Sequence, residues 1–339
     1  MVLLISEDKV KEATIDYLKE RGFEYIIPEY QIFEKYAADF VATNEQNLIA
    51  IECKGSNGRF QEALGQAIIY KRANDAVYIS IPNQGFSYTN IEEEICVNEG
   101  LGILLCHFDD EENCIRVEEI LKPKFDTSVM DLEMRFVILN DLLFENKGKG
   151  RDPQLSKIHR VCEVVWFISQ GIHNRQILID KIIQDSNLNT TKTANIAINM
   201  SRIMDLIKIE TKQSYILTEI GYYLAKLLDN WSDNIIIDLS LNNSFLDNDP
   251  IQAQILSIFR IKCLNFRFVR EVFRVLNKLS INDDSKALTI EEIMNASSHH
   301  RPTDVESIKL SANYLEEVGL VKTILRPKKY YLNSELLKL

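Results

Sequence analysis

Three residues that could act together in catalysis lie at the ends of two short apolar runs. Asp39 precedes the first run, residues 40–42, while Glu52 and Lys54 end the second, which begins at Leu48. A short polar segment separates the two runs, and this order predicts a β-hairpin. The acid that opens one strand and the acid and lysine that close its partner are therefore expected to meet at one place.

These side chains suit metal-dependent hydrolysis. Two close carboxylates repel each other unless a cation neutralises them, and Mg²⁺ prefers oxygen ligands. Strand alternation puts Glu52 and Lys54 on one face and Cys53 on the other. A lysine beside such a metal can orient or deprotonate a water and stabilise charge that develops on a phosphate. The alternative is a solvated strand end, where the same residues form surface ion pairs.

The elements around the hairpin predict an α/β core. An amphipathic helix with a serine N-cap and a glycine stop precedes the hairpin, and a second helix follows it. Two nearly continuous apolar runs are typical of strands in a sheet that helices cover. The expected elements are a helix at 6–21, a strand at 23–27, a helix at 58–72 and strands at 75–82 and 102–108.

Asp39 and the later Glu52-Cys53-Lys54 resemble the D…(D/E)xK signature of the PD-(D/E)xK nuclease superfamily. Ala38 stands where the signature often has proline. The resemblance covers roughly residues 1–125 and implies a restriction-endonuclease-like core, with a mixed sheet flanked by helices. It also implies that Asp39 and Glu52 bind Mg²⁺ and that the lysine assists the attack of water on a phosphodiester.

Gln66 and Tyr70 match the Q-x-x-x-Y helix motif of the RecB-like branch of that superfamily. They lie one turn apart on one helix face, where they could support the lysine and a phosphate or simply pack the helix on the sheet. The resemblance also implies an extra acid from the first helix. Glu12 and Glu7 are both candidates for that metal ligand, and a solvated helix face is the alternative for each.

The net charge of −11 opposes nonspecific binding to nucleic acid, but the charge is unevenly distributed. Residues 1–125 hold 12 Lys and Arg against 23 Asp and Glu, so the excess is N-terminal, whereas residues 126–339 hold 27 of each. The acids gather at 92–94 and 109–112, which we expect to be solvated loops. Local basic patches must therefore make any phosphate contact.

The cysteines and the hydropathy pattern limit the cellular setting. The six cysteines are scattered without a C-x-x-C pair, which predicts buried thiols in a reducing cytoplasm, without zinc or disulfides. No apolar run approaches the length of about 18 residues that a membrane helix needs. The start of the chain lacks the basic segment of a signal peptide. We expect a cytoplasmic protein without a membrane partner.

Beyond residue 125 the composition becomes helical. Residues 126–153 predict a helical connector that ends in a basic, glycine-rich linker at 145–153, which is either solvated or in contact with a DNA backbone. Residues 154–232 show the order of three helices, a hairpin and a closing helix that is typical of a winged helix-turn-helix. Their third helix is thinly charged and offers Lys192, Asn195, Asn199 and Arg202.

A second winged-helix pattern covers residues 250–339. One long helix is expected to carry the basic residues between 260 and 278, and capping boxes at Thr289 and Thr303 start two more helices. Strands at 321–325 and 330–332 form the wing. The candidate DNA contacts of this unit are Arg301, Lys309, Arg326, Lys328 and Lys329, which surround the third helix and the wing.

Together these patterns predict a Mg²⁺-dependent deoxyribonuclease, with Mn²⁺ as an alternative metal and winged-helix domains that recognise DNA. A restriction-like or repair endonuclease is the favoured type. The competing hypothesis is a non-enzymatic DNA-binding or regulatory protein with a nuclease-like fold, and the winged helices could instead build a homodimer. A metabolic α/β enzyme lacks support, because the chain has no G-x-G-x-x-G, G-x-x-x-x-G-K-[ST] or G-x-S-x-G motif.

Overall fold

The computed structural model divides the chain into two compact units, Met1–Lys147 and Gly148–Leu339. No helix among the described residues is long and apolar enough to span a membrane. The structure describes residues 4–33, 35–44, 46–86, 88–125, 130–143, 156–185, 190–241, 245, 248–281, 283–297, 305–324 and 327–337.

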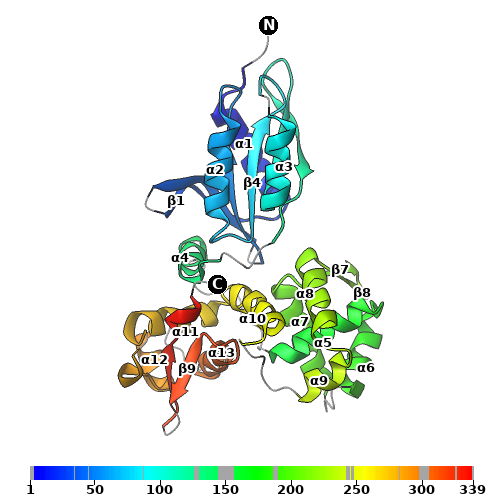
Figure 1. Cartoon of the computed structure of the whole chain (residues 1–339), viewed down its shortest axis with the longest axis vertical. Helices are drawn as coiled ribbons and strands as arrows, with labels where there is room; N and C mark the ends of the chain where they lie inside the picture. Colours follow the sequence, from blue (N-terminus) through cyan, green and yellow to red (C-terminus); the bar gives the residue numbers. More distant parts are fainter. Residues whose placement is uncertain are drawn as a thin grey trace. The chain divides into compact units, whose positions relative to one another are not determined.

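The first unit is built on a six-stranded mixed sheet in the order β1-β2-β3-β4-β5-β6 (Figure 1). The pairs β3–β4 and β4–β5 are parallel, and the remaining pairs are antiparallel. The predicted α/β class is therefore confirmed. The elements are α1 (Glu7–Glu20), β1 (Tyr25–Phe33), β2 (Tyr36–Thr43), β3 (Leu48–Cys53), α2 (Phe60–Tyr70), β4 (Ala76–Pro82), α3 (Asn90–Glu99), β5 (Gly102–Phe108), β6 (Cys114–Leu121) and α4 (Leu132–Leu143).

Helices cover both faces of this sheet. Cys53 points toward Thr14 of α1, with Sγ 3.9 Å from Oγ1, whereas its neighbour Glu52 points toward Tyr70 of α2. The core beneath α1 contains Val10 and Leu18, and burying each such side chain contributes about 1.5–3 kcal/mol. The alternation predicted for β3 is thus confirmed, and it separates an apolar face from a face that carries polar groups.

The start of α1 is fixed against the end of β3. Ser6 caps the helix by accepting a hydrogen bond from Lys9 N, as its sequence predicts. Ser56 N donates to Ile5 O at 2.9 Å, and Ile5 N donates to Ser56 Oγ at 2.9 Å. A Cβ on Gly55 would lie 2.6 Å from Glu7 N, so this close approach requires glycine. The first turn of α1 is therefore positioned directly beside the residues that follow β3.

The second unit consists of helices and two short hairpins. The predicted helices and strands of 154–232 are present with small shifts in their ends. Its elements are α5 (Ile158–Ser169), α6 (Arg175–Asp185), α7 (Thr191–Ile203), β7 (Ile207–Thr211), β8 (Ser214–Leu217), α8 (Glu219–Trp231), α9 (Ile235–Leu241), α10 (Pro250–Cys263), α11 (Arg267–Leu279), α12 (Ile290–Ala296), α13 (Val305–Glu317), β9 (Val321–Ile324) and β10 (Lys329–Leu332), with 3₁₀ turns at Asp284–Lys286 and Ser334–Leu336.

Each of the two hairpins also forms an isolated β-bridge with a residue earlier in the chain. Asn174 pairs with Ser214 of β8, and Leu288 pairs with Tyr330 of β10. In each case the bridge follows one helix (α5 or α11) and precedes two more. The two halves of the unit therefore repeat one order: helix, bridge, two helices and hairpin.

Four expectations need correction. The single long helix expected to carry the basic residues between 260 and 278 is two helices, since α10 ends at Cys263 and α11 begins at Arg267. The acids at 92–94 lie in α3, where Glu92 is buried and closes a capping box with Thr89. The strand expected at 23–27 begins at Tyr25 and continues to Phe33, and β6 was not expected. Cys114 is exposed, unlike the other five cysteines.

Candidate active site

The register of three strands places carboxylates side by side near the end of β3. Asp39, which was expected to open its strand, lies inside β2. Phe40 pairs with Ile51 between β2 and β3, so the next step of this register sets Asp39 opposite Glu52. Pro28 and Tyr30 of β1 pair with Phe40 and Ala38, which sets Glu29 opposite Asp39 from the other side. Like charges directly opposite each other destabilise a sheet. The row Glu29, Asp39, Glu52 therefore needs cations.

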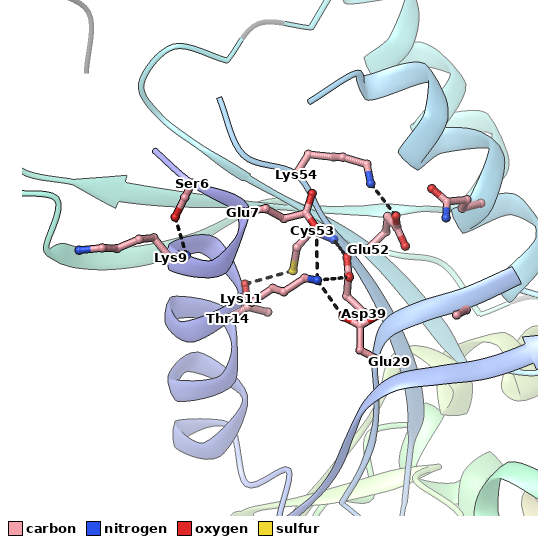
Figure 2. Close-up of polar contacts among 12 residues, drawn as sticks. Ser6, Glu7, Lys9, Lys11, Thr14, Glu29, Asp39, Glu52, Cys53 and Lys54 are labelled. Atoms are coloured by element: carbon pink, nitrogen blue, oxygen red, sulfur yellow. Dashed lines mark hydrogen bonds and ion pairs between the residues drawn. The ribbon is translucent and has the colours of Figure 1, made fainter. Parts of the chain in front are cut away.

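Asp39 and Glu52 are buried, with 8 % and 3 % of their surfaces exposed. Asp39 Oδ2 accepts a hydrogen bond from Cys53 N at 2.6 Å, and its Oδ1 lies 2.7 Å from Lys11 Nζ. Glu52 Oε1 lies 2.7 Å from Lys54 Nζ. Figure 2 shows these residues converging from α1, β2 and β3. The structure thus brings together the three residues predicted to be catalytic.

The environment raises the pKa of both carboxyls above their ordinary values. The net pKa of Glu52 is raised to about 7, because burial and the charge of Asp39 raise it by more than Lys54 and Tyr70 lower it. Burial also raises the pKa of Asp39, although Lys11 and the amide of Cys53 oppose this. A site that resists two negative charges in this way favours a bound cation.

Lys54 is held through both its backbone and its side chain. Its backbone N donates to Ser80 O of β4 at 2.9 Å, and its ammonium donates to Glu52. Burial lowers the pKa of Lys54, but the hydrogen bond to Glu52 and the nearby carboxylates raise it by more, so the net pKa is raised. A Cβ on Gly58 would lie 2.8 Å from Lys54 Cβ. Gly58, which no sequence motif singled out, therefore leaves room for this side chain.

Tyr70 supports Glu52 from α2. Its hydroxyl lies 2.6 Å from Ala37 O and 3.2 Å from Glu52 Oε2, and its one hydrogen can serve either acceptor. Gln66 Nε2 lies 3.4 Å from the Tyr70 oxygen, a weak contact. Tyr70 therefore contacts Glu52 and the backbone of β2, and Gln66 contacts Tyr70. Their link to Lys54 is indirect, through Glu52.

Of the two acids considered on α1, the structure places Glu7 beside the site. Glu7 Oε1 lies 3.2 Å from Lys11 Nζ, and the charge of Glu7 contributes to the raised pKa of Asp39. Glu12, the proposed metal ligand, is exposed on α1. Lys11 itself was missed by the sequence reasoning. The signal available was its position one helical turn after Glu7.

The charges of the cluster fit one divalent cation. The cluster contains four carboxylates (Glu7, Glu29, Asp39, Glu52) and two ammonium groups (Lys11, Lys54), so its formal charge with all groups ionised is −2. Carboxylate oxygens are the donors that Mg²⁺ and Mn²⁺ accept. Within the described ranges, no group of three or more His, Cys, Asp or Glu side chains is arranged to hold a metal. Asp39 and Glu52 are the buried pair among these carboxylates.

The predicted DNA contacts of the second unit are only partly described. Lys309 is exposed on α13. Lys328 is not a free cation, because its Nζ lies 2.7 Å from Glu316 Oε2 and 3.0 Å from Asn313 Oδ1. Lys329 is half-buried at the start of β10. Arg301 and Arg326, and with them the capping residue Thr303 and the linker at 145–153, lie outside the described residues.

Comparisons with known proteins give slight similarities. No known family profile matches the sequence, and no curated protein matches it. Among solved structures, the SPO1766 protein of unknown function from Silicibacter pomeroyi is similar at a TM-score of 0.31 and 13% identity, over 41% of this chain and 85% of that one. SfsA of Pyrococcus furiosus, in complex with Ca²⁺, is similar at a TM-score of 0.22 and 12% identity, over 35% of this chain and 62% of its own. These similarities assign neither the nuclease fold nor an activity.

Proposed function

We propose that the first unit is a Mg²⁺-dependent deoxyribonuclease domain of the PD-(D/E)xK type, with Asp39, Glu52 and Lys54 as its catalytic residues. The proposal is carried by one observation: strand register places two buried carboxylates opposite each other, with a lysine on one of them, in a cluster of net charge −2. Mn²⁺ is the expected substitute for Mg²⁺. A bound divalent metal would polarise the phosphate and lower the pKa of a water.

The protein's own groups position the reactants. Asp39 and Glu52 would hold the metal, with Glu52 oriented by Tyr70. The raised pKa of Lys54 keeps it as an ammonium at neutral pH, so it would donate hydrogen bonds to a water or to phosphate oxygens rather than take a proton. Gln66 would act through Tyr70. The phosphodiester would enter at the carboxyl end of β3, where Lys54 is 13 % exposed.

Recognition of DNA is proposed for the second unit. The repeated order of helix, bridge, two helices and hairpin supports two winged helix-turn-helix domains. In the C-terminal copy, α13 would enter the major groove, and Lys309, Lys328, Lys329, Arg301 and Arg326 would approach the duplex. Lys328 must first exchange Glu316 for a phosphate, which reduces its contribution.

The test is cleavage of circular and linear DNA in Mg²⁺ by wild type and by Lys54→Ala. Cleavage of the circular form by wild type would identify an endonuclease, and its loss in Lys54→Ala would assign the lysine. Lys19→Ala is a matched control, because Lys19 is an exposed lysine at the far end of α1. Equal cleavage by wild type and Lys54→Ala would contradict the assignment.

The second candidate is a DNA-binding protein without catalysis. It is favoured by the ion pair between Lys11 and Asp39, which occupies one of the two proposed ligands. In that case Lys11 would be the permanent counter-ion of the site, and DNA binding would not depend on divalent metal. DNA binding by wild type that is equal in Mg²⁺ and in a chelator, without cleavage, would select this candidate.

A further inference from the structure

Lys11 is held by three carboxylates from three separate elements. Its Nζ lies 2.7 Å from Asp39 Oδ1, 2.9 Å from Glu29 Oε1 and 3.2 Å from Glu7 Oε1 (Figure 2). Three carboxylates around one amine favour its charged ammonium form. The side chain is 19 % exposed. Lys11 therefore adds a positive charge inside the proposed active site.

This arrangement places one donor on each oxygen of Asp39. Lys11 takes Oδ1, and the amide of Cys53 takes Oδ2. A divalent cation that approaches Asp39 therefore meets an ammonium group on the same oxygen, and the two positive charges repel each other. Lys11 has two other acceptors, Glu7 and Glu29. It can release Asp39 and remain paired.

We propose that Lys11 is a displaceable counter-ion: it neutralises Asp39 in the metal-free protein and moves onto Glu7 and Glu29 when a divalent cation binds. This rests on the proposed metal-dependent function. Lys11 then sets the concentration of divalent metal at which the site fills. It acts on metal binding and is a positioning residue, not a catalytic one.

The proposal predicts the sign of the effect of removing Lys11. Lys11→Met keeps the aliphatic chain and changes the charge of the cluster from −2 to −3. The affinity for Mn²⁺ should rise at least about tenfold, because the competing charge is gone. Lys11→Gln should raise it as well, although the amide can still donate to Asp39. Lys11→Arg should bind Mn²⁺ within about threefold of wild type.

Isothermal titration of the full chain with Mn²⁺, without DNA, measures these affinities. Thermal unfolding confirms that each variant is folded. Lys9→Met is a matched control on the same helix, because Lys9 pairs with Glu112 and not with the site. Its affinity should equal that of wild type.

Each outcome is decisive. Unchanged or weaker Mn²⁺ binding by both Lys11→Met and Lys11→Gln would overturn the counter-ion role, and would mean that Lys11 orients Asp39. Failure of the proposed function gives a different result. If neither wild type nor Lys11→Met binds Mn²⁺, or if Glu52→Gln leaves the Mn²⁺ affinity unchanged, the carboxylates are not a metal centre.

Discussion

The acid cluster of the first unit and the C-terminal hairpin of the second hold their charged groups in opposite ways. In the cluster, Asp39 and Glu52 are buried, and their separation is set by the register of β2 and β3. In the hairpin, Lys328 is exposed and contacts Glu316 of the neighbouring helix and the ring of Tyr330. A buried charge has a large energetic consequence, whereas an exposed pair contributes about 0–1 kcal/mol.

This difference predicts how strongly each place responds to substitution. Removing one buried partner leaves the others uncompensated, so single substitutions in the cluster should have large effects. The hairpin lysines can exchange partners at little cost, so their substitution should have small effects. Substitutions at both places, and the dependence of metal binding on pH, test this contrast.

The largest effect is expected from Asp39→Ala or Glu52→Ala. Either change should reduce Mg²⁺-dependent nicking of supercoiled plasmid by at least about 100-fold, because the metal loses one of two carboxylate ligands. Glu12→Ala should cleave like wild type, since Glu12 is exposed on α1. If Glu12→Ala is impaired as strongly as Asp39→Ala, the placement of Glu7 rather than Glu12 at the site is wrong.

Metal affinity should depend on pH through Glu52. With a pKa of about 7, this carboxyl is protonated below neutral pH and must release its proton to bind a cation. Affinity for Mg²⁺ should therefore fall as pH decreases below 7, by up to about tenfold per pH unit. Titrations at several pH values measure this. A pH-independent affinity between pH 5 and 7 would contradict the role of Glu52 as a ligand.

Tyr70→Phe should have a moderate effect. It removes the hydroxyl near Glu52 and Ala37 while keeping the buried ring. Loss of such a supporting partner typically costs about 10–100-fold in metal affinity or activity, and we expect the lower end because Lys54 still orients Glu52. Gln66→Ala should cost less, since its contact is longer. A larger loss in Gln66→Ala than in Tyr70→Phe would reverse their assigned roles.

The metal-free protein should lose stability through Glu52 as pH rises. The folded pKa of about 7 exceeds the ordinary 4.5, so the folded state binds this proton more tightly than the unfolded state does. The stabilising contribution is complete below about pH 4.5 and disappears as pH rises through about 7. In chelator, the unfolding free energy of Glu52→Gln should rise relative to that of wild type by at least about 1 kcal/mol as pH increases from 5 to 8. Denaturant titrations measure this difference, and a difference that stays constant with pH would contradict the raised pKa of Glu52.

The smallest effect is expected from the C-terminal hairpin. Lys328→Ala with Lys329→Ala should weaken DNA binding equally for all sequences and reduce the salt slope by about 1, because each neutralised phosphate contributes roughly 0.9 to that slope. We expect the change to correspond to one phosphate rather than two, because Lys328 is already paired with Glu316. Titrations with specific and random duplexes at several salt concentrations measure the slope. Binding equal to wild type at every salt concentration would assign the hairpin to protein contacts.

Strand periodicity made part of the site predictable. Side chains alternate with a period of two, so Glu52 and Lys54 had to share a face, and the hairpin had to bring Asp39 to them. Lys11 was not predictable in this way. Its place depends on how α1 is rotated against the sheet, which the contacts of Gly55 and Ser56 determine.

Helix ends were also only partly predictable from the sequence. The capping box at Thr289 was recognised and starts α12, whereas the equivalent box at Thr89 was not, and α3 was mistaken for a loop. The break between α10 and α11 contains no glycine or proline. At this break the side chain of Arg270 donates hydrogen bonds to Leu264 O and Asn265 O, a local contact that no sequence pattern indicated.

The residues of the site, from Glu7 to Tyr70, come from one continuous stretch of the chain. Their contacts close short loops, which costs little entropy and favours rapid folding. We therefore expect the cluster to assemble early during synthesis, before the second unit has been made. A stretch with these groups in one piece can also be transferred to another chain by a single insertion, so other domains can be joined to it without rebuilding the cluster.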